Sequence, residues 1–313
     1  MNAYVPFICL TAGAVINWKG LPQSVLKIFD SLTNIALFVL MLVIGLNIGM
    51  SKEVMDNLGT IGFNCIVLSL SAILFSVLLV VFAEHTVMPL EKIRLGLSAE
   101  CRTNTSENND SRFSALIIIM PLCIAAGIIS GKFIFSGADG QIIDIALTAS
   151  LVFLYTGVGV SIGSNKEVFS YIRKLGFRIL FMPMAIFAGC VAGGAISGLF
   201  LGIPLEWSVL SASGMGYYSL TGAFLTESFG VEAGTYGFIV NVSRDVFTVM
   251  FLPLLSKISK GSPIASGAAG CMDTMLVPIT KVVGAELGMV ALISGTILTF
   301  AVPFWLPLGI YLF

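Results

Sequence analysis

The sequence predicts an all-α polytopic membrane protein with about eight transmembrane helices, two re-entrant or broken helical hairpins, and inverted repeats. Three observations support this fold class. The 313-residue chain is 57% hydrophobic, whereas soluble globular chains are about 45–50% apolar, and its mean hydropathy is +1.00. Its apolar runs approach or exceed the roughly 20 residues that a helix needs to cross a bilayer. Finally, one long segment of the chain recurs further along.

The apolar runs define the expected spans. They cover residues 3–17, 29–50, 60–83, 114–135, 142–163, 178–202, 235–256 and 286–313. Two further stretches, residues 208–230 and 264–284, are also apolar but contain glycines and polar groups. A bilayer tolerates irregular backbone only where it is buried in protein or lines a cavity. We therefore expect each of these two stretches to form a re-entrant or broken helix.

The charges exclude one class of partner and indicate an orientation. Charged residues make up 11% of the chain and the net charge is −1. This charge balance gives no indication of a basic surface that would bind nucleic acid. Twelve lysines and arginines fall in the expected loops of one side, and only Lys52 and Lys132 fall on the other. Because cytoplasmic loops are enriched in these residues, the first side is predicted to be cytoplasmic and both termini to face outward.

A repeat divides the chain. Ile44–Phe63 aligns without gaps with Val158–Phe177, and both copies contain a Lys-Glu pair. Because the repeated unit has three spans, the second copy must be inverted, which is a recurring design of secondary transporters. The predicted division is then a first three-span repeat, a cytoplasmic connector, an inverted three-span repeat, and two re-entrant-plus-span units that carry the transport site. These parts cover residues 1–83, 84–113, 114–202 and 203–313.

A shorter repeat relates the two broken stretches. Gly230–Ile239 aligns without gaps with Gly284–Ile293, and in the same register Pro253 aligns with Pro307. Chance coincidence of glycine and leucine in apolar sequence is the alternative explanation. If the repeat is real, each unit is one hairpin and one span, and the two units are again inverted relative to each other. The hairpins would then face each other across the midplane.

Asp245 is the first candidate for a functional group. It lies near the middle of an expected span, where a charge costs about 2.5–3.5 kcal/mol on insertion scales. The adjacent Arg244 is a poor partner, because neighbours on a helix point about 100° apart, so a salt bridge to another helix is the structural alternative. Asn241 lies four residues earlier on the same helix face and could share a ligand or a proton path with Asp245.

Asp273 and Thr274 form a second candidate, within GAAGCMDTMLVP. A half-helix that begins near these residues would point unpaired N–H groups into the protein and favour an anionic ligand group. The alternative is that Asp273 only caps the half-helix, and both roles are compatible.

The hydroxyl- and glycine-rich stretch Ser211–Gly230 supplies further candidates, and Asn47 in the first repeat supplies another. For Glu227, the acid of this stretch, contact with substrate or protons and simple solvation are equal alternatives. The adjacent Tyr217 and Tyr218 could bind a ligand or could instead anchor at a bilayer interface. The glycines around Asn47 favour close helix packing over a site. The candidates named here are Glu227, Ser213, Ser219, Tyr217, Tyr218 and Asn47.

An enzyme is poorly supported, and we expect no cofactor and no metal site. The only histidine, His85, lies at a membrane edge, which argues against a Ser/His/Asp triad or a histidine metal site. Intramembrane aspartyl proteases use Tyr-Asp and Gly-x-Gly-Asp, whereas this chain has Ser-Arg-Asp and Cys-Met-Asp. The six cysteines mostly lie in apolar runs and are interpreted as packing residues.

Three motifs, GMGYYSLTGAFLTESFG, NVSRDVFTVMFLP and GAAGCMDTMLVP, resemble the LysO family of bacterial lysine exporters. The resemblance implies a secondary exporter of L-lysine in the bacterial cytoplasmic (inner) membrane, with eight spans and both termini outside. It maps a functional acid of the family onto Asp245. A second acid, expected near the end of the second span, has no intramembrane counterpart, because that position is nearest to Asn47 and the closest acids are Glu53 and Asp56.

The resulting hypothesis is export of L-lysine, and of its analogue thialysine, by proton antiport, with lipid around the chain and a homodimer as the expected assembly. Asp245 would bind either the lysine ammonium or a proton in alternating access. A transporter of the same architecture for another amino acid, a cation or an organic anion is the alternative. An intramembrane enzyme is a more distant alternative.

Overall fold

A computed structural model describes residues 4–16, 23–86, 122–123, 125–133, 140–164 and 177–312. Every regular element in these ranges is a helix. Most of the predicted connector and part of the second copy of the long repeat, within residues 87–121 and 165–176, lie outside the described residues. The helical fold class predicted from composition is therefore confirmed for the part of the chain that can be examined.

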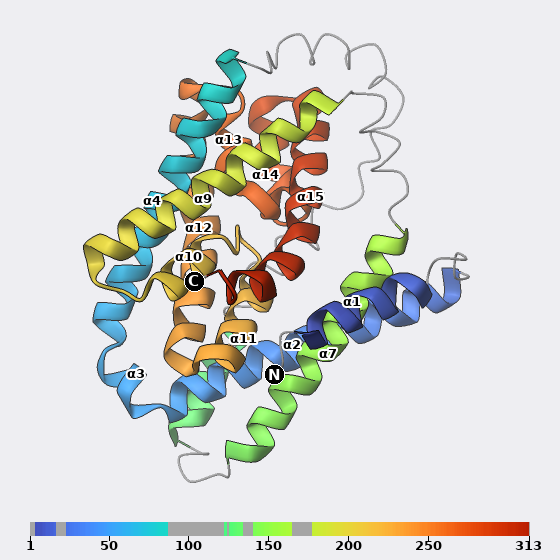
Figure 1. Cartoon of the computed structure of the whole chain (residues 1–313), viewed down its shortest axis with the longest axis vertical. Helices are drawn as coiled ribbons and strands as arrows, with labels where there is room; N and C mark the ends of the chain where they lie inside the picture. The colour runs from blue at the N-terminus through green and yellow to red at the C-terminus, as the bar shows by residue number, and fades with distance from the viewer. Residues whose placement is uncertain are drawn as a thin grey trace.

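The helices of the first two-thirds of the chain follow the predicted apolar runs closely. In chain order they are α1 (Tyr4–Ile16), α2 (Gln23–Met50), α3 (Lys52–Asp56), α4 (Leu58–Thr86), α7 (Gly140–Ser164), the 3-10 turn η2 (Phe177–Leu180) and α9 (Phe181–Leu201). Residues 125–133 are also helical. Figure 1 shows α1, α2 and α7 packed together on one side of the molecule and α4 crossing α9 on the other.

The last third alternates short and long helices. In order they are α10 (Leu205–Ala212), α11 (Tyr218–Phe229), α12 (Val231–Ile258), α13 (Ser262–Gly267), the 3-10 turn η3 (Ala268–Met272), α14 (Leu276–Val283) and α15 (Ala285–Gly309). Each predicted broken stretch is thus two short helices joined by a break. We call residues 213–217 the first break and residues 268–275 the second break. The half-helix after the second break begins at Leu276, slightly later than predicted, because the backbone turns through Asp273 and Thr274 before becoming helical.

Five of the described helices are long and apolar enough to cross a membrane. They are Ser31–Met50, Leu58–Thr86, Arg178–Leu201, Val231–Ile258 and Glu286–Gly309. Large apolar side chains such as Phe82, Leu199 and Phe200 are exposed on the outer surface, while hydroxyl, amide and charged groups are buried inside. This distribution suits an apolar surrounding, so the chain is a helical, multi-pass membrane protein.

Glycines let the helices of the long repeat approach closely, and the contacts are reciprocal. A Cβ atom on Gly13 of α1 would lie 3.0 Å from Cα of Gly159 on α7. A Cβ atom on Gly127 would lie 2.9 Å from Cα of Gly45 on α2. In the register of the long repeat, Gly127 and Gly159 are the counterparts of Gly13 and Gly45. The first helix of each copy therefore packs on the second helix of the other copy.

The shorter repeat also has geometric counterparts. Gly230 and Gly284 precede the long helices α12 and α15, and their φ angles are +95° and +94°. In both units a threonine of the preceding short helix lies against the glycine that follows in the long helix: Thr226 against Gly234, and Thr280 against Gly288. Figure 1 shows α11 in the lower half of the bundle and α14 in the upper half, with α12 and α15 leading away in opposite directions.

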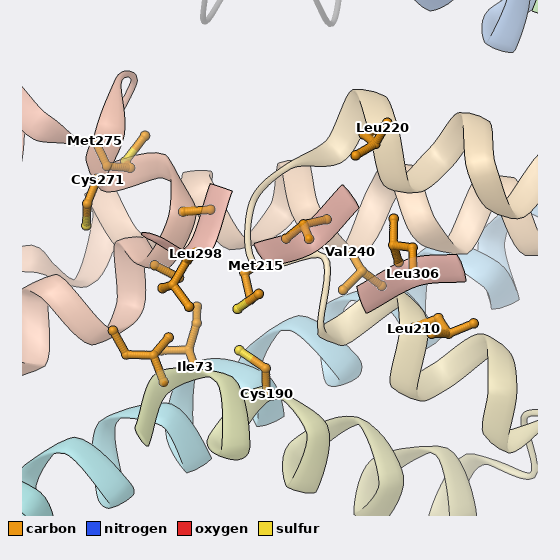
Figure 2. Close-up of a cluster of buried hydrophobic side chains, with 14 of the residues drawn as sticks. Ile73, Cys190, Leu210, Met215, Leu220, Val240, Cys271, Met275, Leu298 and Leu306 are labelled. Atoms are coloured by element: carbon orange, nitrogen blue, oxygen red, sulfur yellow. The ribbon is translucent and has the colours of Figure 1, made fainter. Parts of the chain in front are cut away.

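The two breaks meet in the interior. The backbone N–H of Ala269 donates to the carbonyl of Met215, with an N···O distance of 2.9 Å. The register that pairs Gly230 with Gly284 also pairs Met215 with Ala269. Figure 2 shows the buried apolar side chains around this meeting point, including Met215 from the first break, Cys271 from the second, and Cys190 of α9. Irregular backbone from both hairpins is therefore held within one packed core.

Candidate functional site

Asp245 lies where the two breaks meet. Its side chain is 8% exposed, and its Oδ2 accepts a long hydrogen bond of 3.4 Å from the Thr274 hydroxyl. Its Oδ1 is buried and has no hydrogen-bond partner among the described residues. A Cβ atom on Gly216 would lie 3.2 Å from this Oδ1, and one on Gly270 would lie 3.3 Å from it. Glycine in both breaks thus leaves room for the carboxylate of α12.

A pocket opens beside Asp245. Its volume is about 390 Å³, within the usual range for small-molecule sites. Its lining is mostly apolar, and Asp245 is the one charged side chain among the described lining residues. These residues are Tyr218, Val242, Asp245, Val246, Val249, Met250, Thr274 and Met275. An acceptor-only carboxylate at an apolar wall suits a ligand with a cationic head and an aliphatic body.

The predicted tyrosines divide between two roles. Tyr218 lines the pocket, and its ring packs edge-on against Phe238 with centroids 5.8 Å apart. Tyr217 belongs to the first break: its N–H donates to the carbonyl of Gly214 at 2.8 Å. Ser219 is buried in the first turn of α11. The structure therefore places Tyr218, but neither Tyr217 nor Ser219, among the pocket residues.

Thr274 connects the two predicted acids. Its hydroxyl bonds to Asp245, and its backbone N–H donates to the Asp273 carboxylate. Asp273 is itself more exposed than Asp245 and is not among the pocket-lining residues. Because α14 begins at Leu276 with Met275 as its N-cap, Asp273 is not the cap of that helix. Its carboxylate instead stabilises the turn that precedes the helix.

Asn241 and Arg244 form hydrogen bonds to the main chain of the hairpins. The Asn241 side chain accepts from the Gly216 N–H and donates to the carbonyls of Ser211 and Gly237. Arg244 donates through Nε to the Ser266 carbonyl and through Nη2 to the Ala265 carbonyl; its Nη1 donates to the sulfur of Cys190. These donors and acceptors all come from the protein itself.

Three other predicted residues lie away from the pocket. The Ser213 hydroxyl donates to the Val209 carbonyl and accepts from the Trp305 indole N–H, both at 2.7 Å. Glu227 accepts a 3.1 Å hydrogen bond from the Thr148 hydroxyl of α7. Asn47 lies near the end of α2, and its buried amide nitrogen has no hydrogen-bond partner within the described part of the chain. Their proposed contact with substrate or protons stays a prediction.

Sequence reasoning missed the glycines and the apolar wall of the site. Gly216 and Gly270 are equivalent positions in the register of the shorter repeat, so extending that repeat upstream would have paired them. Val242, Val246 and Val249 have the spacing of one helix face, which also contains Asp245. In the described ranges no group of three or more histidine, cysteine, aspartate or glutamate side chains could hold a metal ion.

The parts of the chain that contain these residues match a known family. A family model described as "Lysine exporter LysO" matches residues 7–97 and 121–310, which together are most of the chain. The chain belongs to the LysO lysine exporter family. The family resemblance inferred from the three motifs is therefore confirmed, and membership places the chain among amino-acid exporters and not among enzymes.

Two curated relatives fit this assignment. The chain is 25% identical over 284 residues to the "Lysine exporter LysO" of Escherichia coli (strain K12), an alignment that covers 90% of each protein. It is 30% identical over 152 residues to a "Putative lysine exporter" of Haemophilus influenzae, covering 47% of this chain and 75% of the relative. No solved structure matches this LysO family member.

Proposed function

We propose that this chain exports L-lysine across the bacterial inner membrane in exchange for protons, with Asp245 as the exchanging group. One observation carries the proposal: the Asp245 carboxylate is buried beside an apolar pocket, and its Oδ1 has no partner among the described residues. A buried carboxylate oxygen without a hydrogen-bond partner is costly. It therefore favours either a bound proton or a bound ammonium group, and the two compete for the same atoms.

Lysine fits this arrangement chemically. Its aliphatic stem can pack against Val246, Val249 and Met250, and its ammonium can reach the carboxylate of Asp245. Moving its single positive charge out against a negative interior costs about 2.3 kcal/mol per 100 mV. Exchange for one inward proton removes that electrical cost. Thialysine, which has the same charges, is expected to share the path.

The polar end of the amino acid needs partners of its own. The second break supplies the Thr274 hydroxyl beside Asp245, and the Asp273 carboxylate beyond it. Tyr218 contributes a ring and a hydroxyl group at the pocket. We assign the α-amino and carboxylate groups of the substrate to this region, so that the hairpins recognise the amino acid while Asp245 couples its movement to the proton.

The repeats support alternating access. In the long repeat, Gly13 meets Gly159 as Gly127 meets Gly45, and such reciprocal contacts fit two copies related by a two-fold axis, as inverted repeats are. In the short repeat, Met215 and Ala269 bond to each other at equivalent positions. Two inverted scaffolds around one central carboxylate can expose it to either side in turn. In this proposal eight spans follow from the apolar runs and outward-facing termini from the loop charges, while a homodimer stays a prediction.

Transport by vesicles tests the central claim. In proteoliposomes with an imposed proton gradient, Asp245→Asn is expected to abolish the exchange of radiolabelled lysine for protons. Glu232→Gln is the matched control, because this acid lies in the first turn of the same helix and is not among the pocket-lining residues. It should exchange lysine at close to the parental rate. Parental exchange by Asp245→Asn would reject the assignment.

A transporter of the same architecture for another solute is the competing function. An organic anion is disfavoured, because the pocket-lining residues that the structure describes carry a negative charge and no positive one. Another cationic amino acid or a simple cation would suit the same carboxylate. Growth of an overexpressing strain on thialysine separates these cases: protection supports lysine export, and unchanged sensitivity favours another solute.

A further inference from the structure

We infer that Asn241 and Arg244 are positioning residues that fasten the two hairpins to α12, so that both breaks stay in contact with Asp245. The inference rests on the proposed function only for the role of Asp245. Neither residue needs to touch the substrate, because its polar atoms already bond to the protein. We call the pair the hairpin clamp.

Asn241 fastens the first hairpin. It is fully buried, and its Oδ1 accepts from the N–H of Gly216 at 2.7 Å. Its Nδ2 donates to the carbonyl of Ser211 at 2.9 Å and to that of Gly237, in its own helix, at 2.7 Å. One side chain thus bonds both ends of the break between α10 and α11. Loss of the bond to Oδ1 would leave the main-chain N–H of Gly216 unpaired, which is costly in an apolar interior.

Arg244 fastens the second hairpin. Its guanidinium donates to the carbonyls of Ala265 and Ser266 at 2.9 and 2.8 Å, in the last turn of α13. The last carbonyls of a helix lack intrahelical partners and carry partial negative charge. A cation in this position satisfies them, which explains how Arg244 can be 1% exposed.

Asn241 and Arg244 bond to carbonyl groups at equivalent positions of the short repeat. Ser211 and Ala265 are counterparts in the register of the short repeat, and their carbonyls bond to Asn241 and Arg244 of the same helix. In α15 the position equivalent to Asn241 is Gly295. A Cβ atom on Gly295 would lie 2.7 Å from the carbonyl carbon of Cys271, so α15 makes a close backbone approach there instead. The clamp therefore belongs to α12 alone.

The clamp explains why Asp245 faces both breaks. It lies four residues after Asn241 and directly after Arg244 in the same helix. Fixing α10 and α13 to the two preceding side chains fixes Gly216 and Gly270 near the carboxylate, at the distances that admit no Cβ atom without a tight contact. The geometry of the exchanging group is thereby set by hydrogen bonds that the substrate does not enter.

Hydrogen–deuterium exchange of the purified protein in detergent tests the clamp without any substrate. In Asn241→Ala, amides of peptides covering residues 211–218 and 268–275 should exchange about tenfold faster, because the Gly216 bond is lost and Met215 anchors Ala269. Arg244→Gln should have the same effect on residues 263–275, and Arg244→Lys should restore much of the protection. Asn64→Ala is the control, since it loses an interhelical bond of 3.0 Å to Tyr236 away from the breaks, and it should leave both peptides unchanged.

Transport separates positioning from substrate binding. If Arg244 instead bound the substrate carboxylate, Arg244→Gln would raise the KM for lysine while the amides of both hairpins kept their parental hydrogen–deuterium exchange rates. This result would overturn the inference. Parental exchange rates in Asn241→Ala would overturn it as well. If the parental protein moved no lysine, the proposed function would fail. Faster amide hydrogen exchange in the clamp variants would still support the clamp.

Discussion

Replacement of Gly216 by alanine isolates the contact between the first break and Asp245. Gly216 has φ = +97°, and an added Cβ atom would lie 3.2 Å from Oδ1 of Asp245 and 3.5 Å from the N atom of Gly270. The first distance is tighter than ordinary van der Waals contact, so the carboxylate or the second break must shift. Gly230 is a matched control, because its φ is +95° and a Cβ atom added there would meet nothing within 4 Å.

Two costs are expected for Gly216→Ala, and only one for Gly230→Ala. A positive-φ conformation that is rare for non-glycine residues costs about 1–3 kcal/mol, and both variants share a loss of stability of this kind. Crowding of a packed interior adds about 1–3 kcal/mol, and in Gly216→Ala this term falls on the site. If the crowding raises the transport barrier by about 1–3 kcal/mol, lysine exchange by Gly216→Ala should fall by roughly fivefold or more, because about 1.36 kcal/mol corresponds to a factor of ten in rate.

The assay compares both variants in proteoliposomes of equal protein content, with thermal unfolding in detergent as the measure of stability. Both should unfold a few degrees below the parental protein, while only Gly216→Ala should lose transport. Equal transport rates in the two variants would refute the argument that glycine is required there to make room for the carboxylate. A transport loss in Gly230→Ala as large as that in Gly216→Ala would attribute the defect to backbone strain alone.

Two further changes probe the site and its scaffold. Thr274→Val removes the hydroxyl that bonds to Asp245 and should lower lysine exchange several-fold, whereas Thr274→Ser should retain most of it; equal rates would exclude a role for the hydroxyl. Gly13→Val places side-chain atoms against the α7 backbone, near Val160, and should lower the yield of folded protein measured by size-exclusion chromatography. Gly59→Val is the control and should keep the parental yield, because a Cβ atom there would meet nothing within 4 Å. Equal yields of the two variants would contradict the close packing of α1 on α7.

The helices could be predicted because their signal is local. A span is a continuous apolar run, and the predicted run at residues 142–163 differs from α7 (Gly140–Ser164) by two residues or fewer at each end. The breaks were also predictable as interruptions, since glycine and polar groups fit poorly in a lipid-facing helix. Their detailed backbone was not: Met215 and Ala268 adopt positive φ angles, which no residue preference would assign to methionine or alanine.

For the candidate site, the sequence pointed to Asp245 and its neighbours but did not indicate which of their polar groups bond to the protein itself. Helical spacing correctly placed Asn241 one turn before Asp245. Asn241, however, bonds to the main chain of the first hairpin, whereas Asp245 lines the pocket. Which polar group is left over depends on how many main-chain donors and acceptors the breaks leave unpaired, and that number follows from the irregular backbone. Asn241 and Arg244 satisfy those groups. The Asp245 carboxylate keeps one oxygen without a partner within the described residues, and this is the atom for which we propose that lysine and a proton compete.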